Sequence, residues 1–432
     1  MLSVIALAQS ANAITLDAVL DRTLEKNPAI RQAKANVEQA AGQRLVLRSI
    51  MWPDVKLLVP AGVQGGHRAG EGGVKAFGFV RVFFTQQLLN AAIAPSRRLG
   101  DVDLLIAQQQ LNVAVVEQLH AARLAFYTAL YTRELQSIQE DQRHRFEQNV
   151  ASQKSRYEAG LAQRSDFVAA TVEASELTSA IETAKRARET ARLQLAEAMG
   201  ENPTAESALP EPEGELQFAP VNIDVKSATA RALEERADLK LARLIAGAAN
   251  EQQRIIEAGY YPAVAAHITG DYIPVSGIHR EGSTRRTDDF VGSEVREGAA
   301  YTWRLIDNGK VGGAVMKQRA AREMNELVCR QLEANVGREL SRIRDQLSAI
   351  EGRQKALAGA STTAEESAKL VAQNLAGGLA SQLEYRVTQN GSLQTKSGLL
   401  TAIYEHNVAR AEWDRATGRY FQFSDQSVPA DH

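Results

Sequence analysis

The chain contains two similar stretches, LDRTLEKNPAIRQAKANVEQAAGQRLVLRSIMWPDV (residues 20–55) and TARALEERADLKLARLIAGAANEQQRIIEAGYYPAV (residues 229–264). They align without a gap at one constant offset, which takes Val55 to Val264. The matches include Leu24 with Leu233, Glu25 with Glu234, Ile30 with Leu239, Ala33 with Ala242, Trp52 with Tyr261 and Pro53 with Pro262. Self-similarity at a fixed offset indicates an internal duplication and predicts that the two halves fold alike.

A second signature of the duplication lies further along each half. The tripeptide Gly-Leu-Ala at 160–162 recurs at 378–380. The spacing from Gly160 to the next glycine, Gly200, is repeated without change between Gly378 and Gly418. This shared spacing argues against the alternative of chance similarity between helices rich in Ala, Gln and Glu. Each half is therefore predicted to contain a helix, a strand, a loop, a strand, a very long helix, a Gly-Leu turn and a final helix.

Proline and glycine placement predicts the long helices. Residues 96–202 and 275–428 contain no proline, and 101–200 contain only two glycines, Gly160 and Gly200. Because Pro and Gly are the main helix breakers, we expect helices over 96–159 and 161–199, with a turn at Gly160 and an equivalent turn at Gly378. No single globular domain needs helices of this length, whereas antiparallel coiled coils do.

Four segments break the helical pattern and are predicted to be strands. They cover 52–63 and 75–87 in the first half, and 261–273 and 295–305 in the second. Val264 and Ile268 alternate with polar residues such as Thr269, which fits the lipid-facing and lumen-facing sides of a membrane strand. An ordinary half-buried hairpin with one wet face fits the same alternation. Aromatic side chains gather at the strand ends nearest the helices, as interfacial aromatics would: Trp52, Tyr260, Tyr261, Tyr301 and Trp303.

The duplication also predicts how the chain is divided. Residues 1–13, MLSVIALAQSANA, combine an apolar run with a small-x-small ending, which is typical of a secretory signal peptide. A frayed apolar N-terminus is the alternative. The first repeat then covers 14–200 and the second covers 223–420. Between them lies a linker, 201–222, and after them a C-terminal tail, 421–432.

The composition excludes several classes of function. With 50 Lys and Arg against 52 Asp and Glu, the formal net charge is −2, which argues against a nucleic-acid-binding protein. The single cysteine, Cys329, rules out an intramolecular disulfide and any CxxC-type metal or redox site. We find no catalytic motif, so we expect neither an enzyme nor a cofactor or metal. The sequence has no stretch of about 18 apolar residues, so we expect no transmembrane helix.

Taken together, the WPDV and YYPAV strand starts, TWRLIDNG, RYEAGLAQRSDF and the ATG ending resemble the TolC-type outer-membrane efflux proteins. The resemblance covers the chain from Ile14 to about Tyr420. It implies a homotrimer of a mainly α chain with membrane β structure. The duplicated helical hairpins would form a trimeric periplasmic α-barrel, and each protomer would give four strands to a shared twelve-stranded outer-membrane β-barrel. A mixed equatorial region would lie near 201–220 and the C-terminus.

The resemblance also assigns roles to the two Gly-Leu turns. Glycine permits a positive φ where the chain reverses between antiparallel helices, and it lets another backbone approach closely. In the family these turns form the periplasmic tips that meet a periplasmic adaptor, also called a membrane fusion protein. The tip residues here are Gly160, Leu161, Gly378 and Leu379. The alternative is that the glycines serve turn geometry alone.

Three further residues correspond to the family's periplasmic entrance: Tyr157, Asp166 and Glu384. Threefold symmetry would turn each acid into a ring of three carboxylates, which attracts cations and raises its own pKa. Acids in the first turn of a helix are also favoured by the helix dipole, and Ser381 with Glu384 matches a capping box. Gate and cap remain alternative explanations. The entrance pattern is altered here, because Ala380 occupies the family's basic position and Ala169 and Val387 replace its second acid.

The predicted function is therefore a passive exit duct of a tripartite efflux pump. It would carry small molecules through the outer membrane of a Gram-negative bacterium and would have a long periplasmic extension. Its protein partners would be a periplasmic adaptor and an inner-membrane pump, and its strands would contact outer-membrane lipid. The exit duct of a type I protein-secretion system is the alternative within the class. A soluble periplasmic coiled-coil adaptor or scaffold is the alternative from another class, and it predicts release by salt rather than by detergent.

Overall fold

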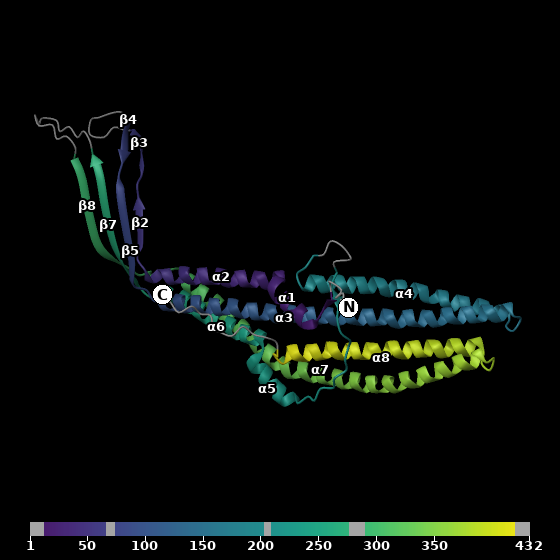
Figure 1. The fold of residues 1–432 in the computed structure, drawn as a ribbon. Coiled ribbons are helices and arrows are strands. Elements are labelled where there is room, and N and C mark those ends of the chain that lie inside the picture. Colours follow the sequence, from purple (N-terminus) through teal and green to yellow (C-terminus); the bar gives the residue numbers. More distant parts are fainter. Residues whose placement is uncertain (1–12, 66–73, 203–208, 276–289, 420–432) are drawn as a thin grey trace, which may run out of the picture. The chain divides into compact units, whose positions relative to one another are not determined.

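The computed structural model describes residues 13–65, 74–202, 209–275 and 290–419. Eight α-helices appear in these residues, four in each predicted repeat (Figure 1). They are α1 (Leu16–Lys26), α2 (Pro28–Arg48), α3 (Ile93–Glu158), α4 (Arg164–Ala198), α5 (Val225–Glu235), α6 (Ala237–Glu257), α7 (Lys310–Ala376) and α8 (Gln382–Ala416). The mainly α class with duplicated long hairpins is confirmed. The predicted signal peptide, apart from Ala13, and the predicted tail lie outside the described residues.

Local chemistry explains where the helices break. Between α1 and α2, the backbone of Asn27 leaves the helical region at φ −59° and ψ 127°, and Pro28 starts the next helix. Proline is favoured at the first helical position because its missing N–H would have no intrahelical partner there. Arg236, the counterpart of Asn27 in the second repeat, breaks α5 from α6 with almost the same angles, φ −60° and ψ 127°. The duplicated sequence therefore reproduces its backbone break.

The strands differ in detail from the sequence prediction. The predicted strands 52–63 and 75–87 are each divided, into β2 (Asp54–Leu58) and β3 (Ala61–Gly65), and into β4 (Val74–Gly78) and β5 (Val80–Leu89). Pro60 lies at the first division, where it cannot donate a backbone hydrogen bond to a neighbouring strand. In the second repeat β7 is Ala263–Val275 and β8 is Phe290–Thr302. The prediction of 295–305 was therefore wrong at both ends, because β8 pairs along the whole of β7.

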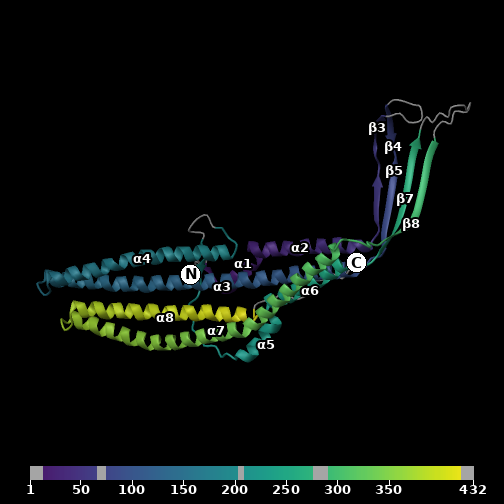
Figure 2. The ribbon, with the colours of Figure 1, turned by 180° about the vertical axis from the view of Figure 1, so that it is seen from behind.

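One sheet contains β2, β5, β7 and β8 in that order, with antiparallel neighbours, and β3 pairs with β4 (Figures 1 and 2). The register places polar side chains opposite one another, because cross-strand partners share a face. This polar face contains Asp54, Lys56, Arg81, Thr85, His267, Thr269, Asp271, Glu294 and Arg296. The opposite face is mainly apolar, with Val55, Leu57, Val82, Phe84, Val264, Ala266, Ile268, Val295, Ala299 and Tyr301; it also carries the polar residues Gln86, Ser293 and Glu297.

The described chain forms two compact units, and each unit draws on both repeats. One comprises residues 1–35, 109–240 and 331–432, and the other comprises 36–108 and 241–330. The duplicated halves are thus intertwined, rather than forming one domain each. Within the described residues, no helix is both long enough and apolar enough to cross a membrane.

In the first unit the hairpins α3–α4 and α7–α8 lie side by side, with α3 next to α8 in both views (Figures 1 and 2). Tyr131 of α3 stacks on Tyr404 of α8 with ring centroids 4.7 Å apart. Two buried apolar clusters support this part of the unit. One includes Val19, Phe126 and Leu195, and the other includes Leu239, Ile343 and Trp413. These hydrophobic contacts are the main stabilising term of the unit.

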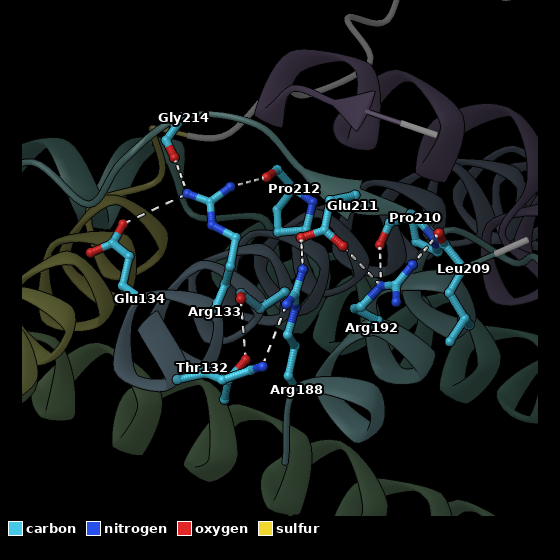
Figure 3. A network of polar contacts seen from close by, with 12 residues as sticks. Thr132, Arg133, Glu134, Arg188, Arg192, Leu209, Pro210, Glu211, Pro212 and Gly214 are labelled. Carbon is cyan, nitrogen blue, oxygen red and sulfur yellow. Dashed lines mark hydrogen bonds and ion pairs between the residues drawn. The ribbon is translucent and has the colours of Figure 1, made fainter. Parts of the chain in front are cut away.

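The segment after the first repeat is clamped to the helices by arginines (Figure 3). Arg133 of α3 donates to the Pro212 carbonyl, while Arg188 and Arg192 of α4 pair with the Glu211 carboxylate at 2.6 and 3.2 Å. Glu211–Pro212 is strand β6, which pairs in parallel with β1 (Ala13–Ile14). The described part of the predicted equatorial linker is therefore a short β element held by charged hydrogen bonds.

Candidate functional site

The two Gly-Leu turns have the same geometry. Gly160 and Gly378 have φ of +74° and +75°, the left-handed region that favours glycine. The N–H of the leucine after each glycine donates to a backbone carbonyl near the end of the helix that precedes the turn. Leu161 donates to the Arg156 carbonyl at 2.7 Å, and Leu379 donates to the Asn374 carbonyl at 2.7 Å. This is the Schellman pattern, which ends a helix by satisfying its last carbonyls.

Both tip leucines are strongly exposed. Leu161 is 72% exposed and Leu379 is 82% exposed, so each presents apolar surface at the end of its hairpin. A Cβ placed on Gly160 meets nothing within 4 Å. On Gly378 it would lie 3.5 Å from Arg156 Nη2. Each turn therefore presents one exposed leucine, and the Gly160 turn also has open space beside its backbone, a surface suited to contact with another protein. Adaptor docking at these residues stays a prediction.

The three entrance residues have different surroundings. Tyr157 stacks on Phe167 with centroids 6.3 Å apart and planes 6° apart, which ties the end of α3 to the start of α4. Asp166 lies in the first turn of α4, whose N-cap residue Gln163 makes no side-chain capping bond. Glu384 lies in the first turn of α8 and completes the capping box with Ser381.

One oxygen of the Glu384 carboxylate, Oε2, caps the start of α8 within one protomer. It accepts from the Ser381 backbone N–H at 2.7 Å and from the Ser381 hydroxyl at 3.0 Å, while the Glu384 N–H donates to that hydroxyl oxygen at 3.2 Å. These donors hold the pKa of Glu384 below its usual value. The predicted capping box is thus present. The ring of carboxylates requires three copies of the chain and stays a prediction.

The residue that joins the two turns is outside the predicted set. Arg156, in the last turn of α3, donates from Nη1 to the carbonyls of Leu375 and Ala376 at the end of α7, each at 3.0 Å. Sequence alone indicated only that a basic residue suits the end of its own helix. The arginine instead reaches the end of a helix in the other repeat, a contact that no local pattern predicts. Arg156 Nη2 also lies 3.5 Å from where a Cβ on Gly378 would be, so the guanidinium lies beside the second turn.

A buried carboxylate on α4 was also missed. Glu173 is only 4% exposed. Its carboxylate accepts from Gln382 Nε2 at 3.4 Å and lies 3.7 Å from Arg386 Nε, both on α8. Burial raises the pKa of Glu173 above its usual value. In the sequence this glutamate resembles many others on exposed helix faces, so its burial could not be recognised.

Comparison with known proteins agrees with this geometry. Residues 19–201 match the family model described as outer membrane efflux protein. That span begins within α1 and ends just after Gly200, so it covers most of the first repeat. Among curated protein sequences, none matches this chain.

Solved structures extend the likeness to nearly the whole chain. The outer membrane protein VceC from the bacterial pathogen Vibrio cholerae matches with a TM-score of 0.78 and 18% identity, covering 93% of this chain and 96% of VceC. The CmeC outer membrane channel of Campylobacter jejuni matches with a TM-score of 0.81 and 12% identity, covering 94% and 86%. The open state of the Neisseria gonorrhoeae MtrE outer membrane channel matches with a TM-score of 0.77 and 16% identity, covering 93% and 88%.

At these low sequence identities, the likeness to solved structures establishes the fold alone. The family model shows a sequence relationship over residues 19–201. The first repeat thus matches the outer membrane efflux protein family, and nearly the whole chain has the fold of solved outer membrane channels.

Proposed function

We propose that three copies of this chain form an outer-membrane channel, the passive exit duct of a tripartite efflux pump. The inner-membrane pump would supply the energy, and a periplasmic adaptor would contact the tip residues Gly160, Leu161, Gly378 and Leu379. The channel would conduct small molecules through the outer membrane of a Gram-negative bacterium. The two-faced sheet with unpaired edges is the observation that carries this proposal.

The sheet has one polar and one apolar face, and β2 and β8 lie at its two ends with one partner each. In lipid, every backbone polar group must be paired, so an open sheet edge is not tolerated. Sharing one barrel among several copies removes the edges, places the apolar face against lipid and leaves the polar face toward the lumen. Three copies of four strands give the twelve-stranded barrel that the family resemblance implies.

Exposed aromatic side chains support the same placement of the sheet. Trp52 precedes β2, Tyr261 precedes β7, and Tyr301 lies near the end of β8; each is more than half exposed. The register places these strand ends together at one end of the sheet. Trp303 Nε1 also donates to the Tyr260 carbonyl at 3.2 Å. Aromatic side chains of this kind are enriched where a membrane meets water.

The matched family and solved structures support efflux over the type I secretion alternative, because the family model is described by efflux. CmeC and MtrE are described as outer membrane channels. The soluble coiled-coil alternative has less support, because a soluble protein's sheet would have no use for an exposed, mainly apolar face with aromatic side chains at one end.

The assembly is tested on protein extracted from membranes. We expect detergent, and not salt, to release the chain, and light scattering corrected for bound detergent to give the mass of a trimer. A monodisperse monomer would contradict the shared barrel. Release by salt alone would favour the soluble coiled-coil protein.

The orientation of the sheet is tested by a matched pair of substitutions on β7. Ile268→Arg, on the apolar face, should cost ~2–4 kcal/mol if the residue lies near the middle of the bilayer. Thr269→Arg, its neighbour on the polar face, should be tolerated. The measurement is the fraction of each variant that inserts into the outer membrane. Equal insertion of both variants would refute the assignment of the faces.

A further inference from the structure

Residues 209–221, which we call the crossing segment, contact all four helices of the two hairpins in turn. At its start, Arg192 of α4 donates to the Leu209 carbonyl at 2.8 Å (Figure 3). Further along, Glu134 of α3 accepts from the Leu216 N–H at 3.1 Å. The segment then reaches α8 and α7, so it joins one hairpin to the other.

Different side chains hold the crossing segment on the second hairpin. Asn407 of α8 donates from Nδ2 to the Gln217 carbonyl at 3.0 Å. The Val221 N–H donates to Oε1 of Glu351, on α7, at 3.4 Å. On the first hairpin, by contrast, arginines pair with the carboxylate of Glu211. The two ends of the segment are therefore held by different chemistry.

His406 of α8 lies at the centre of the second set of contacts. Its side chain is fully buried, and the ring of Phe218 in the crossing segment lies on it with centroids 4.5 Å apart. Within the described residues, both ring nitrogens are buried without a hydrogen-bond partner. Nε2 lies 3.4 Å from Glu351 Oε1, without the alignment of a hydrogen bond. His406, Phe218 and Glu351 thus form one cluster under the crossing segment, the His406 cluster.

The surroundings of His406 favour the neutral imidazole. Burial lowers the pKa of His406 below its usual value of 6.5. The Glu351 carboxylate on α7 acts in the opposite direction, whereas Arg410, one turn along α8, adds to the lowering. The crossing segment presents the uncharged Phe218 to the ring. A buried imidazolium regains water when Phe218 moves away, so protonation favours the state in which the segment has left α8.

We propose that the His406 cluster is an acid-sensitive attachment, which holds the crossing segment on the second hairpin while His406 is neutral and releases it when His406 is protonated. The arginines that hold the segment on the first hairpin stay charged throughout this pH range. Acid would thus disconnect the two hairpins at this segment without detaching it from α3 and α4. The inference goes beyond the proposed function, because it does not require the chain to form a channel.

Proton linkage gives the direction and the steepness of the release. Because the pKa of His406 is lowered while the segment is attached, the released state binds the proton first as the pH falls below 6.5. One proton can change the ratio of released to attached states by up to about tenfold per pH unit. Above this range His406 is neutral in both states, and the attachment does not depend on its titration.

Hydrogen exchange of the purified whole chain measures the release locally. After correction for the intrinsic exchange rate, the Val221 N–H should lose protection in acid by up to about tenfold per pH unit. The Glu213 N–H, which donates to the Ile14 carbonyl at 2.8 Å, lies in the part held by arginines and should keep its protection. Constant protection of Val221 between about pH 8 and 5 would overturn the proposal.

Substitution of the histidine identifies the group that titrates. His406→Leu keeps apolar volume against Phe218 and removes the ring, so Val221 should stay protected in acid. The matched control is His120→Gln, because burial also lowers the pKa of His120, to about 4. His120 lies about 21 Å along α3 from Glu134, at ~1.5 Å per residue, so this variant should respond to pH like the wild type. A wild-type response in His406→Leu would refute the role of His406.

Two further variants keep the test decisive. If His406→Leu does not fold, His406→Gln replaces it, because its side chain is polar and does not titrate; the same loss of protection as in the wild type would again refute the role of His406. Glu351→Gln keeps an oxygen that can accept from the Val221 N–H, and His406 still titrates there, so the response should persist. Its disappearance would assign the response to the Glu351 carboxyl group and overturn the proposal.

Discussion

Two pairs of glycines have the same backbone conformation in different surroundings. The tip glycines, Gly160 and Gly378, have φ of +74° and +75°, and the base glycines, Gly200 and Gly418, which follow the second helix of each hairpin, have +76° and +74°. A Cβ on Gly200 would lie 2.7 Å from the Lys26 carbonyl oxygen. On Gly160 it would meet nothing within 4 Å.

The base glycines pack against the breaks between the short helices. A Cβ added to Gly200 would meet the backbone of Lys26 and Asn27, and one added to Gly418 would lie 3.1–3.2 Å from atoms of Glu235 and Arg236. Asn27 Nδ2 donates to the Ala198 carbonyl at 2.9 Å, at the end of α4. In the second repeat, Arg236 takes the equivalent place beside the end of α8. The same turn thus has two uses: at the base it permits backbone packing, and at the tip it leaves the backbone accessible.

Gly200→Ala should have the largest effect on stability. The left-handed conformation costs a non-glycine residue ~1–2 kcal/mol. Overpacking against the backbone, which cannot move aside as a flexible side chain does, adds ~1–3 kcal/mol. The measurement is the thermal unfolding midpoint of the detergent-extracted protein. A midpoint equal to that of Gly160→Ala would show that packing at the base contributes nothing.

Gly418→Ala should have a similar but smaller effect. Its added Cβ would approach Glu235 Cβ and the Arg236 nitrogen at 3.1 and 3.2 Å, so the neighbours need to move only slightly. We expect a loss of about 2–3 kcal/mol, from the conformational term and mild overpacking. The thermal midpoint should lie between those of Gly200→Ala and Gly160→Ala. A midpoint below that of Gly200→Ala would reverse the ranking.

The tip variants should lose only the conformational term, ~1–2 kcal/mol, and should still form trimers. Gly160→Leu and Gly378→Leu place bulk where an adaptor backbone would approach, so we expect them to lose binding to a purified adaptor. The matched control, Leu161→Ala, removes apolar surface without straining the turn and should weaken binding less. Adaptor binding that survives in both glycine variants would contradict docking at the tips.

The smallest stability effects are expected at the two helix-start acids. Glu384→Gln weakens a capping box, so its thermal midpoint should fall slightly, whereas Asp166→Asn, which has no such box, should change less. The folded-state pKa of Glu384 is lowered, so its contribution is present above its unfolded pKa and is lost as the pH falls through the folded value. The midpoints of Glu384→Gln and wild type should therefore converge in acid. If the difference between the two thermal midpoints does not change with pH, the ionisation of Glu384 contributes nothing to stability.

The same two variants test the entrance ring. Removing one carboxylate from each of three copies should reduce the cation selectivity of single channels in planar bilayers. This readout is independent of the stability change, because Gln retains most of the capping ability of Glu. Selectivity unchanged in both Glu384→Gln and Asp166→Asn would contradict the predicted gate and leave Glu384 as a cap.

Local sequence was sufficient for the helices, the turns and the duplication. Long tracts without Pro, and in the first repeat almost without Gly, favour long helices, and a glycine at the end of such a helix can take the left-handed conformation that stops it. Gly160 and Gly378 were therefore recognised from their spacing, and Ser381 with Glu384 from their capping pattern. The helices, the turns and the capping box depend on residues within a few positions of one another, and the duplication is visible by comparing the two halves of the sequence.

Contacts between distant segments were decided only by the tertiary structure. β8 covers Phe290–Thr302, and not the predicted 295–305, because it pairs with the whole of β7. This pairing gives hydrogen-bond partners to more backbone N–H and C=O groups than a strand over 295–305 would. Arg156 at the end of α7 and Glu173 against α8 are typical helix residues in sequence, and their roles depend on which helix packs beside them. Gly200 differs from Gly160 only because another backbone lies against it. No local pattern carries that information.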